Sequence, residues 1–433
     1  MSLTHLETAY DRNELSDKIE PLLNYDDKLN SALILINVMH TRQISAHHGY
    51  DASQEILALI TKELLAYVKN NCCLLRTGNH EFALLIQNIK NAGHCQLALN
   101  KIIRDLNNKP LSIGKFTSKT KMSVAAALYP LQAISAQNLV QYVEIAMNQS
   151  EESNVSSLMY SKMMSERIVK RLKIETELDI AIQNKELEVW YQPKINAQTG
   201  AIYGVEALSR WRTKTGMFIS PDIFIPLAEE RGFIFDLTRW VINTAFRNQK
   251  EWMAMGLNIN MAVNISGKVI DDDEFVDLIE HSCGIWETAP QHITLEITET
   301  AMMHSMEESL NKLNILKKHG FLLSIDDFGT GYSSLEYFKT LPVHEVKIDK
   351  SFVQNMITSE ADMNLVSMMV GLAKSFSLKT VAEGIEDSKT YEALKSLGVD
   401  RIQGYYVAKP MPEEEFLTWA EYYLTNLESD NLP

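Results

Sequence analysis

The amino-acid sequence predicts two α/β domains, the second of which is an irregular (β/α)8 barrel. The chain has 433 residues, enough for two or three domains of ordinary size. In its C-terminal half, strand-like apolar runs alternate with amphipathic helical segments over roughly 240 residues, the pattern of a parallel barrel. Only the short stretch 193–201 separates the first two runs. It is too short for a helical crossover, so these two strands should form an antiparallel hairpin.

The strand predictions rest on short β-branched and aromatic runs bounded by turn-forming residues. From the second strand onward, most gaps contain an amphipathic helix, as in FDLTRWVINTAFRNQKEWMAMG (235–256). The predicted strands are EVWYQ (188–192), IYGVE (202–206), NMAVNI (260–265), HITLEI (292–297), FLLSID (321–326), HEVKID (344–349), KTVAEG (379–384) and DRIQGY (400–405).

A charged segment without Pro or Gly joins the barrel to the N-terminal half. Within residues 161–187, apolar side chains recur at helical spacing, as in Leu178 and Ile182. We therefore expect an N-terminal domain over 1–160, a helical linker over 161–187 and the barrel over 188–433.

The composition narrows the class of protein. The formal net charge is −15, which disfavours non-specific binding to DNA, RNA or anionic lipid. The four cysteines show no paired CxxC spacing, so we expect reduced thiols and no zinc knuckle. The N-terminus is charged throughout, and no apolar run is long enough to span a membrane. We expect a cytoplasmic protein without membrane insertion.

Polar residues fall near the ends of the predicted strands. In a parallel barrel these positions converge on the C-terminal rim, where barrel active sites lie. So many unpaired charges around one mouth would be costly if their role were only structural. The residues of this ring are Gln192, Glu206, Asn264, Glu296, Asp326, Lys347, Asp349, Glu383 and Gln403.

Two adjacent carboxylates, Asp326 and Asp327, end the fifth predicted strand in FLLSIDDFGTGYSSL (321–335). Neighbours within a strand point to opposite faces, so only a backbone turn at the strand end would let both reach one point. One interpretation is a divalent metal as their shared counter-charge. The other is a turn followed by a helix capped by Ser333 or Ser334.

The ring offers only oxygen ligands, which favour Mg²⁺ or Mn²⁺ over zinc or copper. Two such ions about 3.5–4 Å apart are a standard device for attack of water on a phosphodiester. Lys347 could stabilise the attacking nucleophile, and Arg210 could bind a phosphate oxygen. Glu383 could be a metal ligand or a general base. The residues therefore indicate a metal-dependent hydrolase acting on a phosphorylated ligand.

The C-terminal half resembles the EAL family of cyclic di-GMP phosphodiesterases, from about residue 168 to residue 423. The resemblance rests on YQPK, EALSRW, VNIS, LEITET, DDFGTGYSSL, VKIDKSF, VAEGIE and QGYYVAKP, in family order. It implies a modified TIM barrel, hydrolysis of cyclic di-GMP to linear pGpG with Mg²⁺ or Mn²⁺, inhibition by Ca²⁺, control of biofilm formation and motility, and a homodimer formed through the barrel. His344 and Asp387 depart from common family residues, but neither is an expected metal ligand.

The resemblance also implies roles for individual residues. It implies metal ligands at Glu206, Asn264, Glu296, Asp326, Asp327 and Glu383. It implies catalytic roles for Lys347, Glu383, Glu206 and Asp349, substrate contacts by Gln192, Arg210, Gln403 and Asp349, and loop or outer-sphere roles for Glu299 and Glu386. No expected ligand is missing, which favours an active enzyme over the alternative, a non-catalytic cyclic di-GMP receptor that signals through a partner.

The N-terminal half resembles a GGDEF domain, the fold that makes cyclic di-GMP from GTP. The signature segment LLRTGNHEFALLIQN (74–88) contains Asn79 and His80 where the family has Gly and an acidic residue, and Asn37 stands at a metal-binding Asp position. Further departures fall at Ser45, Ala46, Gln54, Lys69 and Cys72. We therefore expect a central sheet with antiparallel strands flanked by helices, without cyclase activity. A bifunctional cyclase and phosphodiesterase is the weaker alternative.

Overall fold

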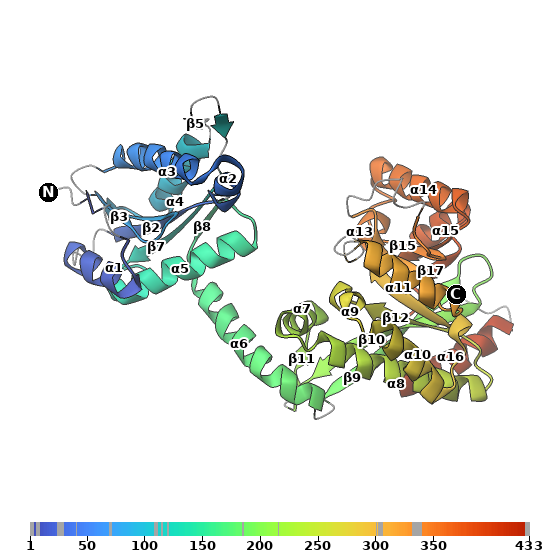
Figure 1. The fold of residues 1–433 in the computed structure, drawn as a ribbon. Helices are drawn as coiled ribbons and strands as arrows, with labels where there is room; N and C mark the ends of the chain where they lie inside the picture. The colour runs from blue at the N-terminus through green and yellow to red at the C-terminus, as the bar shows by residue number, and fades with distance from the viewer. Residues whose placement is uncertain are drawn as a thin grey trace. The chain divides into compact units, whose positions relative to one another are not determined.

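The structure of the chain is a computed structural model that forms two compact units, Met1–Leu172 and Lys173–Pro433 (Figure 1). The division falls within helix α6 (Lys162–Gln183). The structure describes residues 4–5, 9–23, 30–39, 41–68, 72–107, 111–113, 116–118, 121–183, 186–214, 216–299, 301, 306–330 and 340–428.

The first unit is built on a six-stranded sheet with the order β1-β3-β4-β2-β7-β8. Its central strand β2 pairs antiparallel with β4 and β7, whereas β7 and β8 are parallel. The strands are β1 (Thr4–His5), β2 (Asn30–Val38), β3 (Cys72–Arg76), β4 (Glu81–Ile89), β7 (Met122–Tyr129) and β8 (Ser157–Met159). A separate hairpin pairs β5 (Leu111–Ile113) with β6 (Phe116–Ser118).

Helices cover both faces of this sheet (Figure 1). The alternation of β2 explains the two cores, because Ile34 and Ile36 pack into one and Leu33 and Leu35 into the other. The first core includes residues of α3 (Tyr50–Leu65) and α4 (Ala92–Asn107), and the second includes residues of α1 (Arg12–Ile19) and α5 (Ala136–Glu152). Helix α2 (Thr41–His48) precedes α3. The predicted α/β fold with antiparallel strands is confirmed.

The second unit is a closed barrel of eight strands in which the neighbouring pairs are parallel except those made by β9. Two short strands, β11 (Phe218–Ile219) and β18 (Met411–Pro412), add to this sheet by pairing antiparallel with β10 and β9, respectively. Strand β9 pairs antiparallel with β10 and with β17 and so closes the barrel. The barrel strands are β9 (Leu187–Asn196), β10 (Ile202–Arg212), β12 (Asn260–Ile265), β13 (Ile293–Thr298), β14 (Leu322–Phe328), β15 (Glu345–Ile348), β16 (Lys379–Glu383) and β17 (Arg401–Gln403). The predicted irregular barrel and its hairpin are confirmed.

The predicted end of the first barrel strand at Gln192 is wrong. Strand β9 continues to Asn196, and Pro193 lies opposite Val205 of β10. The sequence PKIN reads as a turn because Pro lacks the N–H that a ladder needs. Gln192 therefore lies within its strand, and so does Glu206, because β10 continues to Arg212.

Helices surround the barrel and bury its outer face (Figure 1). One aromatic cluster joins β9, α8 and α16: the ring of Trp252 lies 4.7 Å from that of Tyr191 and 4.8 Å from that of Phe416, between centroids. The helices are α7 (Pro221–Arg231), α8 (Ile234–Ala254), α9 (Gly267–Asp271), α10 (Phe275–Trp286), α11 (Met306–Lys318), α13 (Lys350–Val353), α14 (Glu360–Ser375), α15 (Ser388–Leu397) and α16 (Glu413–Glu428).

Three polar side chains lie together near the N-terminal ends of the parallel barrel strands. Arg401 forms an ion pair with Glu345, which also accepts a hydrogen bond of 3.2 Å from Ser324 Oγ.

In the part of the chain that the structure describes, no helix is both long and apolar enough to cross a membrane.

Candidate active site

The ammonium group of Lys347 lies at the centre of four carboxylates inside the barrel. Its Nζ is 2.8 Å from Glu296 Oε2, 3.0 Å from Asp326 Oδ2, 2.7 Å from Glu383 Oε1 and 3.5 Å from Glu206 Oε2. The side chain of Lys347 is 1% exposed, so these charges interact with little screening by water. We call Lys347 and these four acidic residues the carboxylate cluster.

Strand register brings the cluster and its neighbours to one level. Asn264 lies opposite Glu296, Gln192 opposite Glu206 and Gln403 opposite Glu383. The two oxygens of Glu206 accept hydrogen bonds from Asn264 Nδ2 (2.6 Å) and from Gln403 Nε2 (2.7 Å).

An irregularity in β14 explains how two adjacent aspartates can serve one site. Between the pairs Ile325–Val346 and Phe328–Ile348, β14 contains one residue more than β15. Asp327 takes up this extra length with a φ of 55°, in the left-handed region, and its N–H donates to Asp326 Oδ1 over 2.9 Å. The strict alternation of the strand is broken where the carboxylates occur. Ser333 and Ser334, the alternative helix caps, lie outside the described residues.

Burial and charge set the protonation of the cluster. Burial would raise the pKa of Glu206, but Lys347, Lys194 and the hydrogen bonds from Gln403 and Asn264 outweigh it and lower this pKa to about 2. Burial also raises the pKa of Glu296 to about 7 and that of Glu383 to about 8, against the pull of Lys347. Burial disfavours the charge on Lys347, yet the four carboxylates raise its pKa well above the ordinary value, so it stays protonated.

The donor set fits a hard divalent cation, although the described residues do not form a ready metal cage. Among them, no group of three or more His, Cys, Asp and Glu side chains is arranged to hold a metal ion, and the ammonium of Lys347 occupies the centre. When all are ionised, the four carboxylates outnumber the two ammonium groups of Lys347 and Lys194, which leaves a buried formal charge of −2. A Mg²⁺ or Mn²⁺ ion would compensate this charge with the oxygen ligands that it prefers.

Three other predicted residues lie on the loops beside the cluster. Glu299 Oε2 accepts a hydrogen bond of 3.1 Å from Gly329 N, two residues after Asp327. Asp349 caps α13 by accepting from Ser351 N over 3.0 Å. Glu386 is exposed, and its Oε1 accepts from Gln354 Nε2 over 3.3 Å. The carboxylates of Asp326 and Asp349 add to burial in raising the pKa of Asp327.

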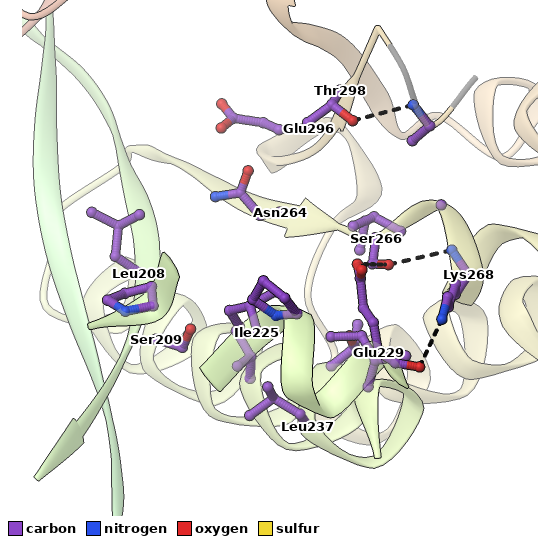
Figure 2. A pocket seen from close by; sticks show the side chains of 18 of the residues that line it. Leu208, Ser209, Ile225, Glu229, Leu237, Asn264, Ser266, Lys268, Glu296 and Thr298 are labelled. Carbon is purple, nitrogen blue, oxygen red and sulfur yellow. Dashed lines mark hydrogen bonds between the residues drawn. The ribbon is translucent and has the colours of Figure 1, made fainter. Parts of the chain in front are cut away.

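Two cavities open beside the cluster and share Leu208 and Arg210 in their walls. The smaller, of about 340 Å³, is lined by Glu206, Asp326, Lys347, Glu383 and Gln403, among others. The larger, of about 770 Å³, is more apolar. Figure 2 shows Glu296 and Asn264 above the apolar side chains of Ile225 and Leu237 in this cavity. Together the cavities offer a space for a ligand with polar and apolar parts.

Arg210 is the cation placed between the two cavities. It is half-buried, and one guanidinium nitrogen donates to Ser209 O over 2.9 Å. The guanidinium carbon lies 5.8 Å from the centre of the Trp190 ring. The remaining guanidinium donors can therefore serve an anionic ligand group at the mouth of the site.

The EAL domain family model matches residues 175–410, more than half of the chain. The chain belongs to the EAL family. The diguanylate cyclase GGDEF domain model matches residues 2–156, so the chain is a GGDEF–EAL tandem protein. It is related to cyclic di-GMP phosphodiesterases.

The chain is similar over nearly all of its length to several curated proteins. It is 31% identical to the bifunctional diguanylate cyclase/cyclic di-GMP phosphodiesterase MucR of Pseudomonas aeruginosa over 93% of this chain and 59% of that protein. It is 29% identical to the cyclic di-GMP phosphodiesterase PdeR of Escherichia coli over 95% of this chain and 62% of that protein. The chain thus spans only about half to three fifths of the length of such relatives.

Solved structures match the EAL part. The structure described as the PaMucR phosphodiesterase in complex with c-di-GMP has a TM-score of 0.55 and 38% identity, over 56% of this chain and 99% of that one. An EAL domain protein from Listeria monocytogenes has a TM-score of 0.52 and 29% identity, over 57% of this chain and 97% of that one.

Three of the predicted departures from the GGDEF family, Asn37, Asn79 and His80, lie at one end of the first unit's sheet, whereas Cys72 pairs with Ile86 near its other end. Asn37 donates to Glu151 Oε1 over 2.6 Å, and it lies opposite Glu81 in the β2–β4 register. Arg76 donates to the carbonyl oxygens of Gly78 and Asn79 and so holds the signature turn. Lys69 lies outside the described residues.

One residue of the EAL site was missed by the sequence reasoning. Lys194 is 1% exposed, and its ammonium contacts Glu296 Oε1 inside the barrel. Lys194 is the last residue of the YQPK motif, but the strand was predicted to end two residues earlier, at Gln192. Recognising that β9 continues through Pro193 would have placed Lys194 on the same strand face as Gln192.

Proposed function

We propose that this chain hydrolyses cyclic di-GMP to linear pGpG in its EAL barrel, with Mg²⁺ or Mn²⁺ bound by the carboxylate cluster. The single observation that carries the proposal is the set of four carboxylates around Lys347, each at a position where the family resemblance implies a metal ligand. The relatives with phosphodiesterase names and the similarity to a phosphodiesterase in complex with c-di-GMP support the choice of substrate.

Each group of residues has a distinct task in this proposal. Glu206, Asn264, Glu296, Asp326, Asp327 and Glu383 hold the cations. A divalent cation bound there polarises the phosphodiester and makes water a better nucleophile. Lys347 supplies a fixed positive charge beside these oxygens, where negative charge develops as the phosphorus is attacked.

The walls of the site orient the substrate. Arg210 lines the cavity beside the cluster, which supports a role in binding a phosphate oxygen through its planar fork. Gln403 is held by its amide nitrogen, which donates to Gln192 Oε1 (2.9 Å) and Glu206 Oε2 (2.7 Å), while its buried Oε1 has no hydrogen-bond partner among the described residues. We assign that oxygen, together with Asp349, to substrate contact or bound water.

The GGDEF part is proposed to be without cyclase activity. Asn37 and His80 replace carboxylates that would hold a metal on GTP. The amide of Asn37 is instead bound to Glu151. What remains is a folded domain joined to the barrel through α6, and we propose that it modulates the barrel or its dimerisation.

The deciding experiment incubates the purified chain with cyclic di-GMP and Mn²⁺ and separates the products by chromatography. Formation of pGpG is expected with Mg²⁺ or Mn²⁺ and not with Ca²⁺, whose larger and looser shell spoils the geometry for in-line attack. Asp326→Ala should reduce turnover by orders of magnitude while the protein stays folded. Cyclic di-GMP that is bound tightly but remains intact would instead identify a receptor.

A second pair of variants separates chemistry from binding. Lys347→Ala should lose turnover and retain much of the affinity for cyclic di-GMP, whereas Arg210→Ala should mainly weaken binding. Conversion of labelled GTP to cyclic di-GMP by the full chain would overturn the proposal for the GGDEF part.

A further inference from the structure

Lys194 is a buried cation with no direct place in the chemistry described above. It lies on β9, the antiparallel strand, and its side chain is 2% exposed. Its ammonium contacts Oε1 of Glu296, whose side chain is 0% exposed. Lys347 contacts the other oxygen, Oε2, over 2.8 Å. Glu296 is therefore held by a different ammonium group at each of its two oxygens.

This arrangement is expensive for a residue that only fills space. A lysine buried away from water loses several kcal/mol of hydration unless its partner repays it. Among the described residues, Glu296 is the only hydrogen-bond or ion-pair partner of Lys194. A Met or Ile of similar length would fill the same part of the barrel without a charge. The cost is explained if the contact to Glu296 has a function.

The strand geometry makes Lys194 well suited to fix Glu296. Gln192 and Lys194 lie two residues apart on β9 and so share a face. Gln192 is level with Glu206, and Lys194 is level with Gly204, one layer deeper in the barrel. A side chain at position 204 would place its Cβ 2.5 Å from Asn260 O, so this layer has no room for another one there. The long side chain of Lys194 reaches Glu296 from below, and Lys347 holds it from within the cluster.

We propose that Lys194 is a positioning residue that holds the carboxylate of Glu296 in the orientation needed for cation binding. This inference rests on the proposed function, because it takes Glu296 as a cation ligand. The ammonium of Lys194 acts on the cation only through Glu296. Outer partners of metal ligands typically contribute about 10- to 100-fold to metal affinity or activity.

The test measures Mn²⁺ binding directly, by calorimetric titration of the full chain without substrate. Lys194→Met should weaken Mn²⁺ binding by about 10- to 100-fold, and Lys194→Arg, which keeps the charge and a donor, should restore most of it. A control on the same strand is Ile195→Ala, which removes buried atoms from the adjacent residue. This control should lower the melting temperature but leave Mn²⁺ affinity unchanged.

A double-mutant cycle identifies the route of the effect. If Lys194 acts through Glu296, Lys194→Met should cause no further loss of Mn²⁺ affinity in a Glu296→Gln background. Equal losses in both backgrounds would overturn the inference, as would unchanged or tighter Mn²⁺ binding by Lys194→Met. Should Lys194→Met fail to fold, Lys194→Gln takes its place in the same cycle. Failure of the unmodified chain to bind Mn²⁺ would instead contradict the proposed function itself.

Discussion

Replacing Lys347 by Met removes the central positive charge of the carboxylate cluster and should strongly destabilise the metal-free barrel. Met has a similar length and no charge, so the change tests electrostatics more than volume. In the variant, Glu206, Glu296, Asp326 and Glu383 would lose the ammonium that lies 2.7–3.5 Å from their oxygens. Lys194 would then be the cation left in contact with one of them.

The size of the effect follows from burial. Removing one partner of a buried, hydrogen-bonded ion pair costs about 3–5 kcal/mol, because the charge left behind is uncompensated. In the unmodified chain the pKa values of Glu296 and Glu383 are already raised to about 7 and 8, so both can take up a proton when Lys347 is lost. The loss of stability is therefore smaller than four times that of a single contact. For a unit of this size, a loss of 3–5 kcal/mol corresponds to a fall in Tm of roughly 6–20 °C.

The assay is thermal unfolding of the full chain in a chelator and in Mn²⁺, following the transition that Mn²⁺ shifts. Mn²⁺ should stabilise Lys347→Met by more degrees than it stabilises the unmodified chain, because the cation supplies the missing positive charge. Lys379→Met is the matched control: its ammonium lies 2.7 Å from Asp400 but is 59% exposed, so little change is expected. A fall in Tm of Lys347→Met no larger than that of this control would refute the reasoning.

Three further predictions test other parts of the molecule. Trp252→Ala should lower the free energy of unfolding by about 3–5 kcal/mol, because the fully buried ring packs between Tyr191 and Phe416. Chemical denaturation would measure this loss, and an effect below about 1 kcal/mol would contradict the packing described. Burial lowers the pKa of His344, whose Nδ1 accepts a hydrogen bond from Leu323 N, so the stability that the neutral imidazole contributes is present above pH 6.5 and is lost as pH falls through the folded pKa. His344→Gln should therefore show a smaller drop in Tm between pH 7.5 and 5 than the unmodified chain, and equal drops would count against this role. A chain begun at Met164 should keep hydrolysis at a changed rate or assembly state, and identical kinetics and oligomeric state would remove the regulatory role of the first unit.

The barrel was predictable because its signal is repeated along the chain. Alternating apolar runs and amphipathic helices gave the strands, and the short gap at 193–201 gave the antiparallel hairpin. Strand ends were less predictable, as β10 shows: its continuation to Arg212 passes through Ser209 and Arg210, which are not strand formers by composition. The hydrogen-bonded pairing with β9 keeps this segment of β10 in the sheet, and the sequence of β10 alone does not reveal which strand it pairs with.

The convergence of these acidic residues was predictable from the sequence, but their geometry was not. Glu206, Glu296, Asp326 and Glu383 were expected at one rim, and the structure brings them together around Lys347. Their mutual arrangement depends on register and on the extra residue at Asp327, which no local pattern specifies. Likewise, the deeper layer that contains Lys194 depends on how β9 continues past Pro193.

The antiparallel strand has a chemical consequence beyond closing the barrel. A parallel strand reaches the catalytic rim only at its C-terminal end, so it offers few side chains to the site. Strand β9 runs the other way, from the level of Trp211 down to that of Ile202. Its inward-facing residues therefore lie at successive depths in the barrel. Gln192 accepts a hydrogen bond from Gln403 at the level of Glu206, and Lys194 contacts Glu296 from the layer below. One strand thus supports two different members of the cluster. For this reason we expect substitutions along the inner face of β9 to alter cation and substrate binding, whereas those on its outer face, such as Ile195, should alter stability alone.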